Sequence, residues 1–220
     1  MIRKLLTVGA AMAAVLAVAA PANAAIPGSV EVGSSTSGAH AVAGVSKGSL
    51  VVTVAGQTLG CASASASGSV YASSPVATPY MDFDTTSWVG CTGPGGLPMN
   101  VTQDPSCTLD ISLAASAVAT NPVTDNPVDS ELSIAPGCLT ASDAITGTLC
   151  TLDIVGNVDA FFDENVKTVD GVDFQELTIS GDTLLLDNVD CFGAINDGDH
   201  VDMTVVFNNH VPDGLVNFKP

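Results

Sequence analysis

The sequence predicts an all-β protein, an antiparallel β-sandwich that is Ig-like in general form and crosslinked by disulfides. Three observations lead to this prediction. Short runs of β-branched residues recur along the chain, turn residues separate these runs, and six cysteines follow an N-terminal secretion signal. Beyond the signal, no window repeats apolar residues convincingly at the spacing of an amphipathic helix.

The N-terminus has the three parts of a secretory signal peptide. Arg3 and Lys4 precede an unbroken apolar run, residues 5–20, and Ala22-Asn23-Ala24 supplies the small residues of a cleavage site. The run is shorter than the roughly 20 residues that a membrane-spanning helix needs. We therefore expect a signal peptide over residues 1–24 and a single secreted domain over residues 25–220, located outside the cell or at its surface, with no transmembrane helix after cleavage.

Several segments alternate apolar and polar residues as half-buried strands do. Residues 49–54 are β-branched, residues 148–155 place Cys150 and Leu152 on one face, and residues 201–207 alternate with Asp202 on the solvated face. Two further runs, residues 177–179 and 184–186, flank Ser180-Gly181-Asp182. A glycine between two apolar runs predicts a hairpin turn there.

The protein is strongly acidic. Its 23 Asp and Glu residues face 5 Lys and Arg residues, a formal net charge of −18, and Arg3 and Lys4 leave with the signal peptide. Nucleic acid is excluded as a partner, because its recognition requires a cationic face that releases counterions. Anionic lipid is disfavoured for the same reason. The charge is consistent with solubility outside the cell or with the binding of a divalent cation.

The cysteines predict disulfides. Six cysteines allow 15 pairings, and the sequence does not choose among them. Their wide spacing is unlike that of zinc ligands, which come in close pairs such as C-x₂-C. Sequential pairing would stabilise the fold by about 3–4 kcal/mol for each bridge on the chain-entropy model. The disulfide candidates are Cys61, Cys91, Cys107, Cys138, Cys150 and Cys191.

One segment carries the residue types of a calcium site. Asn196, Asp197 and Asp199 surround Gly198, and Asp202 follows three residues later. Calcium prefers six to eight oxygen ligands, which such a loop supplies in part. The alternative is a solvated β-turn, for which Asn, Asp and Gly are favoured by their backbone preferences. Apart from this Ca²⁺ site, the sequence predicts no cofactor.

The sequence offers no catalytic constellation, and we predict that the protein is not an enzyme. It has three histidines and no G-x-S-x-G motif. Adjacent carboxylates such as Asp163 and Glu164 are expected by chance among so many acidic residues. Trp88 is expected to pack on the disulfide of Cys91, and Phe161, Phe162 and Phe174 are expected in the core.

Three segments resemble a family of small, uncharacterised secreted β proteins of actinomycetes. They are Gly90-Cys91-Thr92-Gly93-Pro94, the stretch Ala144-Ile145-Thr146-Gly147-Thr148 that leads into Cys150, and a terminal Cys191-Phe192-Gly193 segment that ends in Gly198-Asp199. A weaker similarity connects the chain to PraB-type secreted proteins. The resemblance implies a β-rich exported fold and no catalytic residues.

The leading functional hypothesis is a non-enzymatic secreted or cell-envelope structural protein. Its neutral N-terminal region, rich in Ser, Ala and Gly, predicts flat strands with free edges through which copies of the chain could pair as a homo-oligomer. A second hypothesis is an extracellular module that binds Ca²⁺ or an apolar small molecule. A third is an envelope β-barrel pore subunit, which would need strands longer than those that the sequence suggests.

Overall fold

The computed structural model describes residues 28–115 and 127–219, and the predicted signal peptide lies outside these ranges. Strands account for nearly all regular structure in the described residues. The first seven are β1 (Ser29–Val32), β2 (Gly38–Ser46), β3 (Leu50–Val54), β4 (Gln57–Cys61), β5 (Ser63–Ala72), β6 (Met81–Val89) and β7 (Cys91–Thr92). After a short 3₁₀ turn, η1 (Pro94–Gly96), come β8 (Pro98–Gln103), β9 (Leu109–Leu113), β10 (Val128–Asp143), β11 (Thr151–Val169), β12 (Val172–Asp190), β13 (His200–His210) and β14 (Val216–Lys219).

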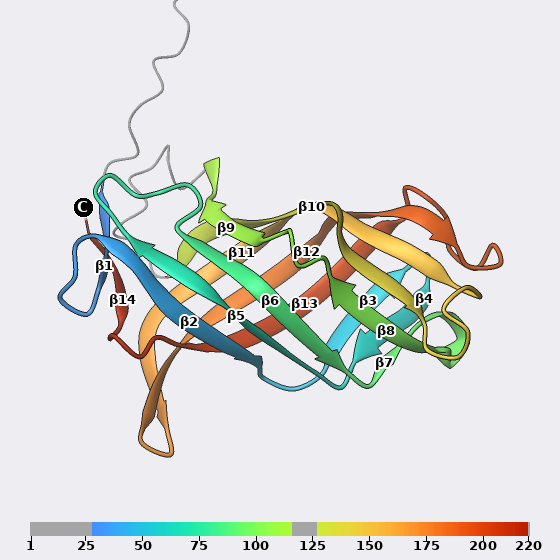
Figure 1. The fold of residues 1–220 in the computed structure, drawn as a ribbon, viewed down its shortest axis with the longest axis horizontal. Coiled ribbons are helices and arrows are strands. Elements are labelled where there is room, and N and C mark those ends of the chain that lie inside the picture. The colour runs from blue at the N-terminus through green and yellow to red at the C-terminus, as the bar shows by residue number, and fades with distance from the viewer. Residues whose placement is uncertain (1–27, 116–126, 220) are drawn as a thin grey trace, which may run out of the picture.

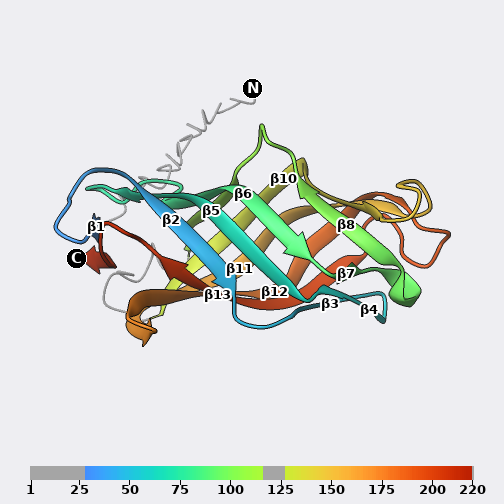
Figure 2. The same cartoon turned by 60° about the horizontal axis from the view of Figure 1, so that its bottom comes forward.

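The strands form two layers along one long axis (Figures 1 and 2). Strands β10, β11, β12 and β13 run through the whole length as one layer. The facing layer has two halves, β2-β5-β6-β9 and β3-β4-β7-β8. Each half pairs with its own stretch of the long strands. On β10, residues 130–133 pair with β9 and residues 139–143 pair with β8. On β13, residues 201–204 pair with β3 and residues 207–210 pair with β2.

This arrangement confirms the all-β, antiparallel, disulfide-linked sandwich that the sequence predicts. It also closes the hydrogen-bond ladder, because every strand of the twelve-stranded sheet has paired neighbours on both sides. Strands β2 and β5, for which free edges were expected, lie between β13 and β6. Strand β5 is paired along most of both edges, whereas β2 is paired on both edges over residues 43–45 and with β5 alone over residues 38–42. Closure of a sheet removes the unpaired N–H and C=O groups that drive edge-to-edge association.

Alternation along each strand builds the core. In β13 the side chains of Val201, Met203, Val205 and Phe207 are buried, while Asp202 between them is exposed. Tyr80 is fully buried, and its ring meets that of Phe218 edge-on at a centroid distance of 5.1 Å. Its hydroxyl is satisfied by Ser130 Oγ at 2.8 Å, as a buried polar group requires.

The six cysteines pair in sequence order as Cys61–Cys91, Cys107–Cys138 and Cys150–Cys191, at separations of 30, 31 and 41 residues. The first bridge joins β4 to β7, and the third joins the start of β11 to the end of β12. Three disulfides fit an oxidising setting. In the described residues, no helix has the length and apolar character that crossing a membrane would require.

The hairpin expected around Gly181 is wrong. Strand β12 runs without a break through this position, and a register shift between Gly181 and Leu184 marks a bulge. A Cβ atom at Gly181 would lie 2.9 Å from Val158 Cγ2, so the glycine permits close packing of β12 on β11. The chain turns instead at Asp170 and Gly171, whose φ angles of 52° and 80° are those of a tight two-residue hairpin.

Candidate functional site

Two loops meet at one end of the long axis, and we call residues 144–150 and 191–199 together the loop end (Figure 1). The Cys150–Cys191 disulfide connects them. Both loops belong to the turns that the resemblance singled out. Each is held by a different set of hydrogen bonds, and the result is a rigid surface.

The first loop folds around a buried carboxylate. Asp143 is 1% exposed and accepts hydrogen bonds from the backbone N–H groups of Thr146 and Leu149, both at 2.6 Å, and from the Thr146 hydroxyl. Burial alone would raise the pKa of Asp143, but these donors, chiefly the Thr146 and Leu149 N–H groups, hold the pKa well below its usual range. The carboxylate of Asp143 is therefore ionised, and it holds the loop through these hydrogen bonds.

The second loop uses the residues predicted to bind calcium. Asp197 Oδ1 accepts the Val189 N–H at 2.7 Å, and Asp199 Oδ2 accepts the Asn196 N–H at 2.8 Å. Ile195 is 1% exposed and anchors the loop in the core. Asp199 therefore caps the backbone of its own loop, and Asp197 ties the loop to the end of β12.

Asp202, the fourth calcium candidate, belongs to strand β13 and not to the loop. It is exposed, and its backbone is paired with Thr53 of β3. Across the described parts of the chain, no three His, Cys, Asp or Glu side chains gather closely enough to hold a metal ion. Calcium binding at Asn196, Asp197, Asp199 and Asp202 stays a prediction.

The loop end exposes large apolar side chains. Phe192 is 79% exposed, Ile145 is 69% exposed and Leu149 is 37% exposed. Phe192 also has a φ of 54°, a conformation that bulky residues rarely adopt. Apolar side chains fixed on rigid loops lose little conformational entropy when a partner covers them.

A second exposed apolar cluster lies on the hairpin that joins β11 to β12. Strand β10 begins to pair with β11 at Phe162, so within the described residues the part of β11 after Phe162 pairs with β12 alone. We call this two-stranded projection, residues 163–174, the arm; Figure 1 shows it below the sandwich at the end opposite to the loop end. Its exposed valines are Val166, Val169 and Val172, at 42%, 52% and 37%.

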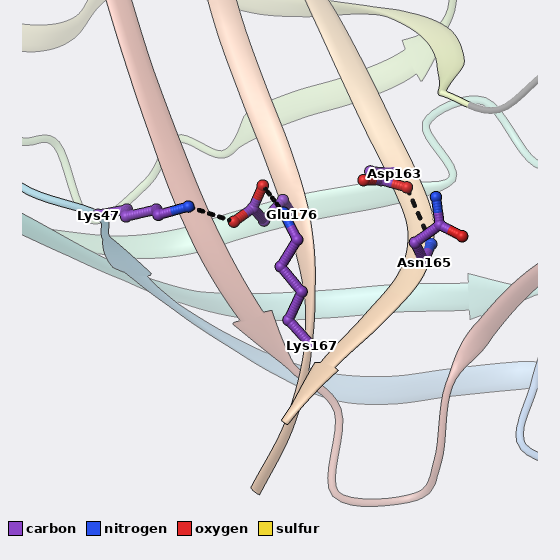
Figure 3. A network of polar contacts seen from close by, with 5 residues as sticks. All are labelled: Lys47, Asp163, Asn165, Lys167 and Glu176. Carbon is purple, nitrogen blue, oxygen red and sulfur yellow. Dashed lines mark hydrogen bonds and ion pairs between the residues drawn. The ribbon is translucent and has the colours of Figure 1, made fainter. Parts of the chain in front are cut away.

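The base of the arm is held by charges (Figure 3). The carboxylate of Glu176 in β12 forms two ion pairs. One oxygen lies 2.9 Å from Lys47 Nζ, and the other pairs with Lys167 Nζ. The hydrogen bond from Lys167, followed by Lys47, lowers the pKa of Glu176 even though partial burial opposes this. Beside this group, Asp163 Oδ1 accepts the Asn165 N–H at 2.9 Å. The arm thus projects from a braced base.

Three further contacts fix the base of the arm to the sandwich. The ring of Phe174 meets that of His210 at a centroid distance of 5.9 Å, and His210 Nδ1 donates to the Asp173 carbonyl at 3.0 Å. On β14, the Phe218 N–H donates to Glu164 Oε1 at 2.7 Å. These contacts hold the base of the arm against β13 and β14.

Other polar groups with catalytic potential make hydrogen bonds within the fold. Asp82, which is buried, accepts the Tyr71 hydroxyl at 2.5 Å and the Ser69 N–H at 3.1 Å. The hydrogen bond to Asp82 raises the pKa of Tyr71 to about 12. His40 Nδ1 lies 2.9 Å from Asp213 Oδ2, and His200 Nδ1 donates to the Asp182 carbonyl at 2.8 Å.

Sequence reasoning missed Asp143 and Phe192. Asp143 lies four residues before Gly147 in a turn-forming stretch, and an Asp in this context often caps the backbone of the residues that follow. Phe192 gave no signal, since exposure of an aromatic side chain depends on the surrounding fold. Of the phenylalanines expected in the core, Phe162 is fully buried, while Phe161 and Phe174 are partly exposed.

No protein-family model, curated protein or solved structure matches this chain. The resemblance to secreted actinomycete proteins accordingly stays a prediction from the motifs.

Proposed function

We propose that this protein is a secreted, non-enzymatic structural protein of the cell envelope or extracellular space that assembles head to tail. In the proposed contact, the loop end of one copy docks on the arm of the next. The observation that carries the proposal is that exposed apolar side chains gather on two braced surfaces at opposite ends of an elongated molecule.

The closed sheet favours this route over strand addition. Because β5 and residues 43–45 of β2 are paired on both edges, association through these backbones would require existing hydrogen bonds to break. Side-chain contacts between the two ends require no such rearrangement. The three disulfides keep both surfaces in place in an oxidising setting.

Both ends carry acidic residues, and the arm has two lysines at its base. The loop end includes Asp197 and Asp199 and has no Lys or Arg. Lys47 and Lys167 lie at the arm, with side chains 59% and 44% exposed. The arm also holds Asp163, Glu164, Asp170 and Asp173, and both lysines already pair with Glu176. A loop end therefore meets carboxylates on an arm as it does on another loop end, and charge alone does not select the pairing.

When a loop end binds an arm, the resulting dimer still has one unoccupied loop end and one unoccupied arm. Such contacts continue into a ring or an open filament. The apolar clusters are small, so we expect weak association that appears at high protein concentration. Salt should promote it, because screening reduces the mutual repulsion of strongly negative copies.

Sedimentation velocity over a wide range of protein concentrations tests the proposal. The wild-type protein should show a sedimentation coefficient that rises with concentration, and more steeply at high salt. Replacing Phe192 with Asn, a residue that tolerates positive φ, together with Ile145→Ser should abolish the rise. The double variant Val169→Thr and Val172→Thr should do the same from the arm.

A matched control uses exposed valines on the faces of the sandwich. Val45 and Val89 are 55% and 57% exposed, and their replacement by Thr should leave the concentration dependence unchanged. A wild-type protein that stays monomeric at every concentration and salt level would contradict the proposal. So would equal loss of association in the control variant.

A further inference from the structure

A cavity of about 90 Å³ lies between the two layers, in the half that contains β3, β4, β7 and β8. Both layers contribute to its wall. Valine, leucine and isoleucine side chains make up much of it, and Phe83, Phe207, Trp88, Met99 and Met203 supply aromatic rings and thioethers. The rings of Phe83 and Phe207 lie side by side with their centroids 6.3 Å apart.

The wall offers almost nothing for a polar molecule to bind. Its hydroxyl-bearing side chains are Thr86 and Thr92, and it includes no charged residue. Thr86 Oγ1 already accepts the indole N–H of Trp88 at 2.9 Å, and Thr92 Oγ1 points to the Gly60 carbonyl at 3.5 Å. A charged or strongly polar molecule would lose its hydration here without gaining hydrogen bonds.

The cavity persists because its wall is fixed. The Cys61–Cys91 disulfide lines it and ties β4 to β7, where the two strands share the pairing of Gly60 with Thr92. Neighbouring strands therefore have limited freedom to move inward and fill the space. Empty cavities lined by apolar groups stay dry and take up small apolar molecules.

The volume limits the occupant to a compact molecule. An apolar cavity of about 150 Å³ in another protein takes benzene or xenon. Met99 and Met203 are unbranched and adapt their shape to a guest more readily than branched side chains do. Met99 packs so tightly over Gly93 that a Cβ atom there would lie 2.8 Å from Met99 Cγ.

From the wall and the volume we infer that this cavity is a binding site for a compact, uncharged hydrocarbon, up to about the size of a single aromatic ring. The site is independent of the proposed head-to-tail contact, since Ile145, Phe192 and the arm valines do not line it.

Trp88 provides a direct reporter. It is the single tryptophan of the chain and lines the cavity, so its indole N–H gives one assigned resonance next to the site. Titration of the ¹⁵N-labelled protein with benzene, and separately with xenon under pressure, should shift this resonance saturably. The thermal unfolding midpoint should rise by a few degrees at saturation, because the ligand binds the folded state.

Filling the cavity should remove the site. Ala141 and Ala66 line it and are buried, so Ala141→Val and, as a second filler, Ala66→Val should weaken binding at least tenfold. Ala43→Val, on the exposed face of β2, is the matched control and should bind as the wild type does. Benzoate, a charged molecule of similar shape, should not bind.

Saturable binding of benzene or xenon that is lost in a folded filler variant supports the site. Absence of binding by both probes overturns it, as does undiminished binding in both fillers. The loop-end variant with Phe192→Asn should bind like the wild type, so a failure of head-to-tail assembly and a failure of this site are separate results.

Discussion

The side-chain amide of Gln175 binds the backbone of Val216 through two hydrogen bonds. Its Nε2 donates to the Val216 carbonyl and its Oε1 accepts the Val216 N–H, both at 2.8 Å, and all of these groups are buried. The amide thus takes the place of a strand neighbour for β14. It also donates to the Glu164 carbonyl at 3.1 Å, which links β12, β14 and the base of the arm.

Gln175→Met should destabilise the protein by about 2–4 kcal/mol. Methionine has a side chain of similar length, but it leaves the buried N–H and C=O of Val216 without hydrogen-bond partners. Urea denaturation at neutral pH measures this change. Gln57→Met is the matched control: Gln57 is exposed on β4, and the expected change there is within about 0.5 kcal/mol. Equal effects of the two substitutions would mean that the amide of Gln175 contributes little.

Asp143 should make the protein sensitive to acid. Its carboxylate has a lowered pKa in the folded state, because backbone N–H groups outweigh the effect of burial, so at mildly acidic pH the unfolded chain takes up a proton that the native protein does not. The stability that Asp143 contributes is therefore complete above its ordinary pKa of about 3.9 and falls as the pH drops below that value.

Asp143→Asn removes this titration, so the urea midpoint of the variant should fall less than that of the wild type between pH 5 and pH 2. At pH 7 the variant should be less stable, because the amide group places its own donors against the Thr146 and Leu149 N–H groups. An identical pH slope in the two proteins would contradict the role assigned to Asp143.

Glu176 should couple the arm to ionic strength. Glu176→Gln breaks the ion pairs with Lys47 and Lys167, and because both lysines are largely exposed we expect a loss of only about 1 kcal/mol at low salt. The difference from the wild type should shrink as salt screens the charges. A loss that is independent of salt would indicate that packing of the glutamate stem, and not its charge, holds the arm.

The Cys150–Cys191 disulfide should matter for assembly as well as for stability. Replacing both cysteines with serine should cost about 4 kcal/mol on the chain-entropy model for a separation of 41 residues, and it should release the two loops from each other. Head-to-tail association should weaken as a result. Replacing Cys107 and Cys138, separated by 31 residues, should cost a similar amount but leave association intact, because Cys138 lies at the bulge in the middle of β10 and not beside the loop end.

The strand content is predictable because alternation and turn residues are local signals. The position of the hairpin turn was predicted wrongly, at Gly181 instead of Gly171. Gly181 and Gly171 both sit between apolar strand residues and next to an Asp. Only the fold reveals that Val158 of β11 packs against Gly181 and needs the space, while Asp170 and Gly171 adopt positive φ. The Asp-Gly pair was the stronger hairpin signal in the sequence.

The closure of the sheet could not be predicted from the same signals. It depends on β10 and β13 being long enough to pair with two different strands each, at residues 130–133 and 139–143 of β10, for example. Such pairings join residues far apart in sequence, and alternation within a strand does not specify its neighbours. The order of the disulfides is likewise a property of the finished fold.

At the loop end, the sequence predicts a turn but not which groups the side chains of the turn contact. Asp197 and Asp199 are residue types that bind ions, yet Asp199 accepts a backbone N–H of its own loop and Asp197 accepts the Val189 N–H at the end of β12. Side-chain direction decides between these roles, and composition does not contain it. The exposure of Phe192 is a similar case, because it follows from the disulfide next to it and from the burial of Ile195.

The measurement that tests the head-to-tail account most directly is a mixing experiment. The loop-end variant (Phe192→Asn with Ile145→Ser) keeps a working arm, and the arm variant (Val169→Thr with Val172→Thr) keeps a working loop end. Each alone should sediment as a monomer, and an equal mixture should form a dimer that grows no further. A mixture that stays monomeric while the wild type assembles would contradict the pairing of unlike ends.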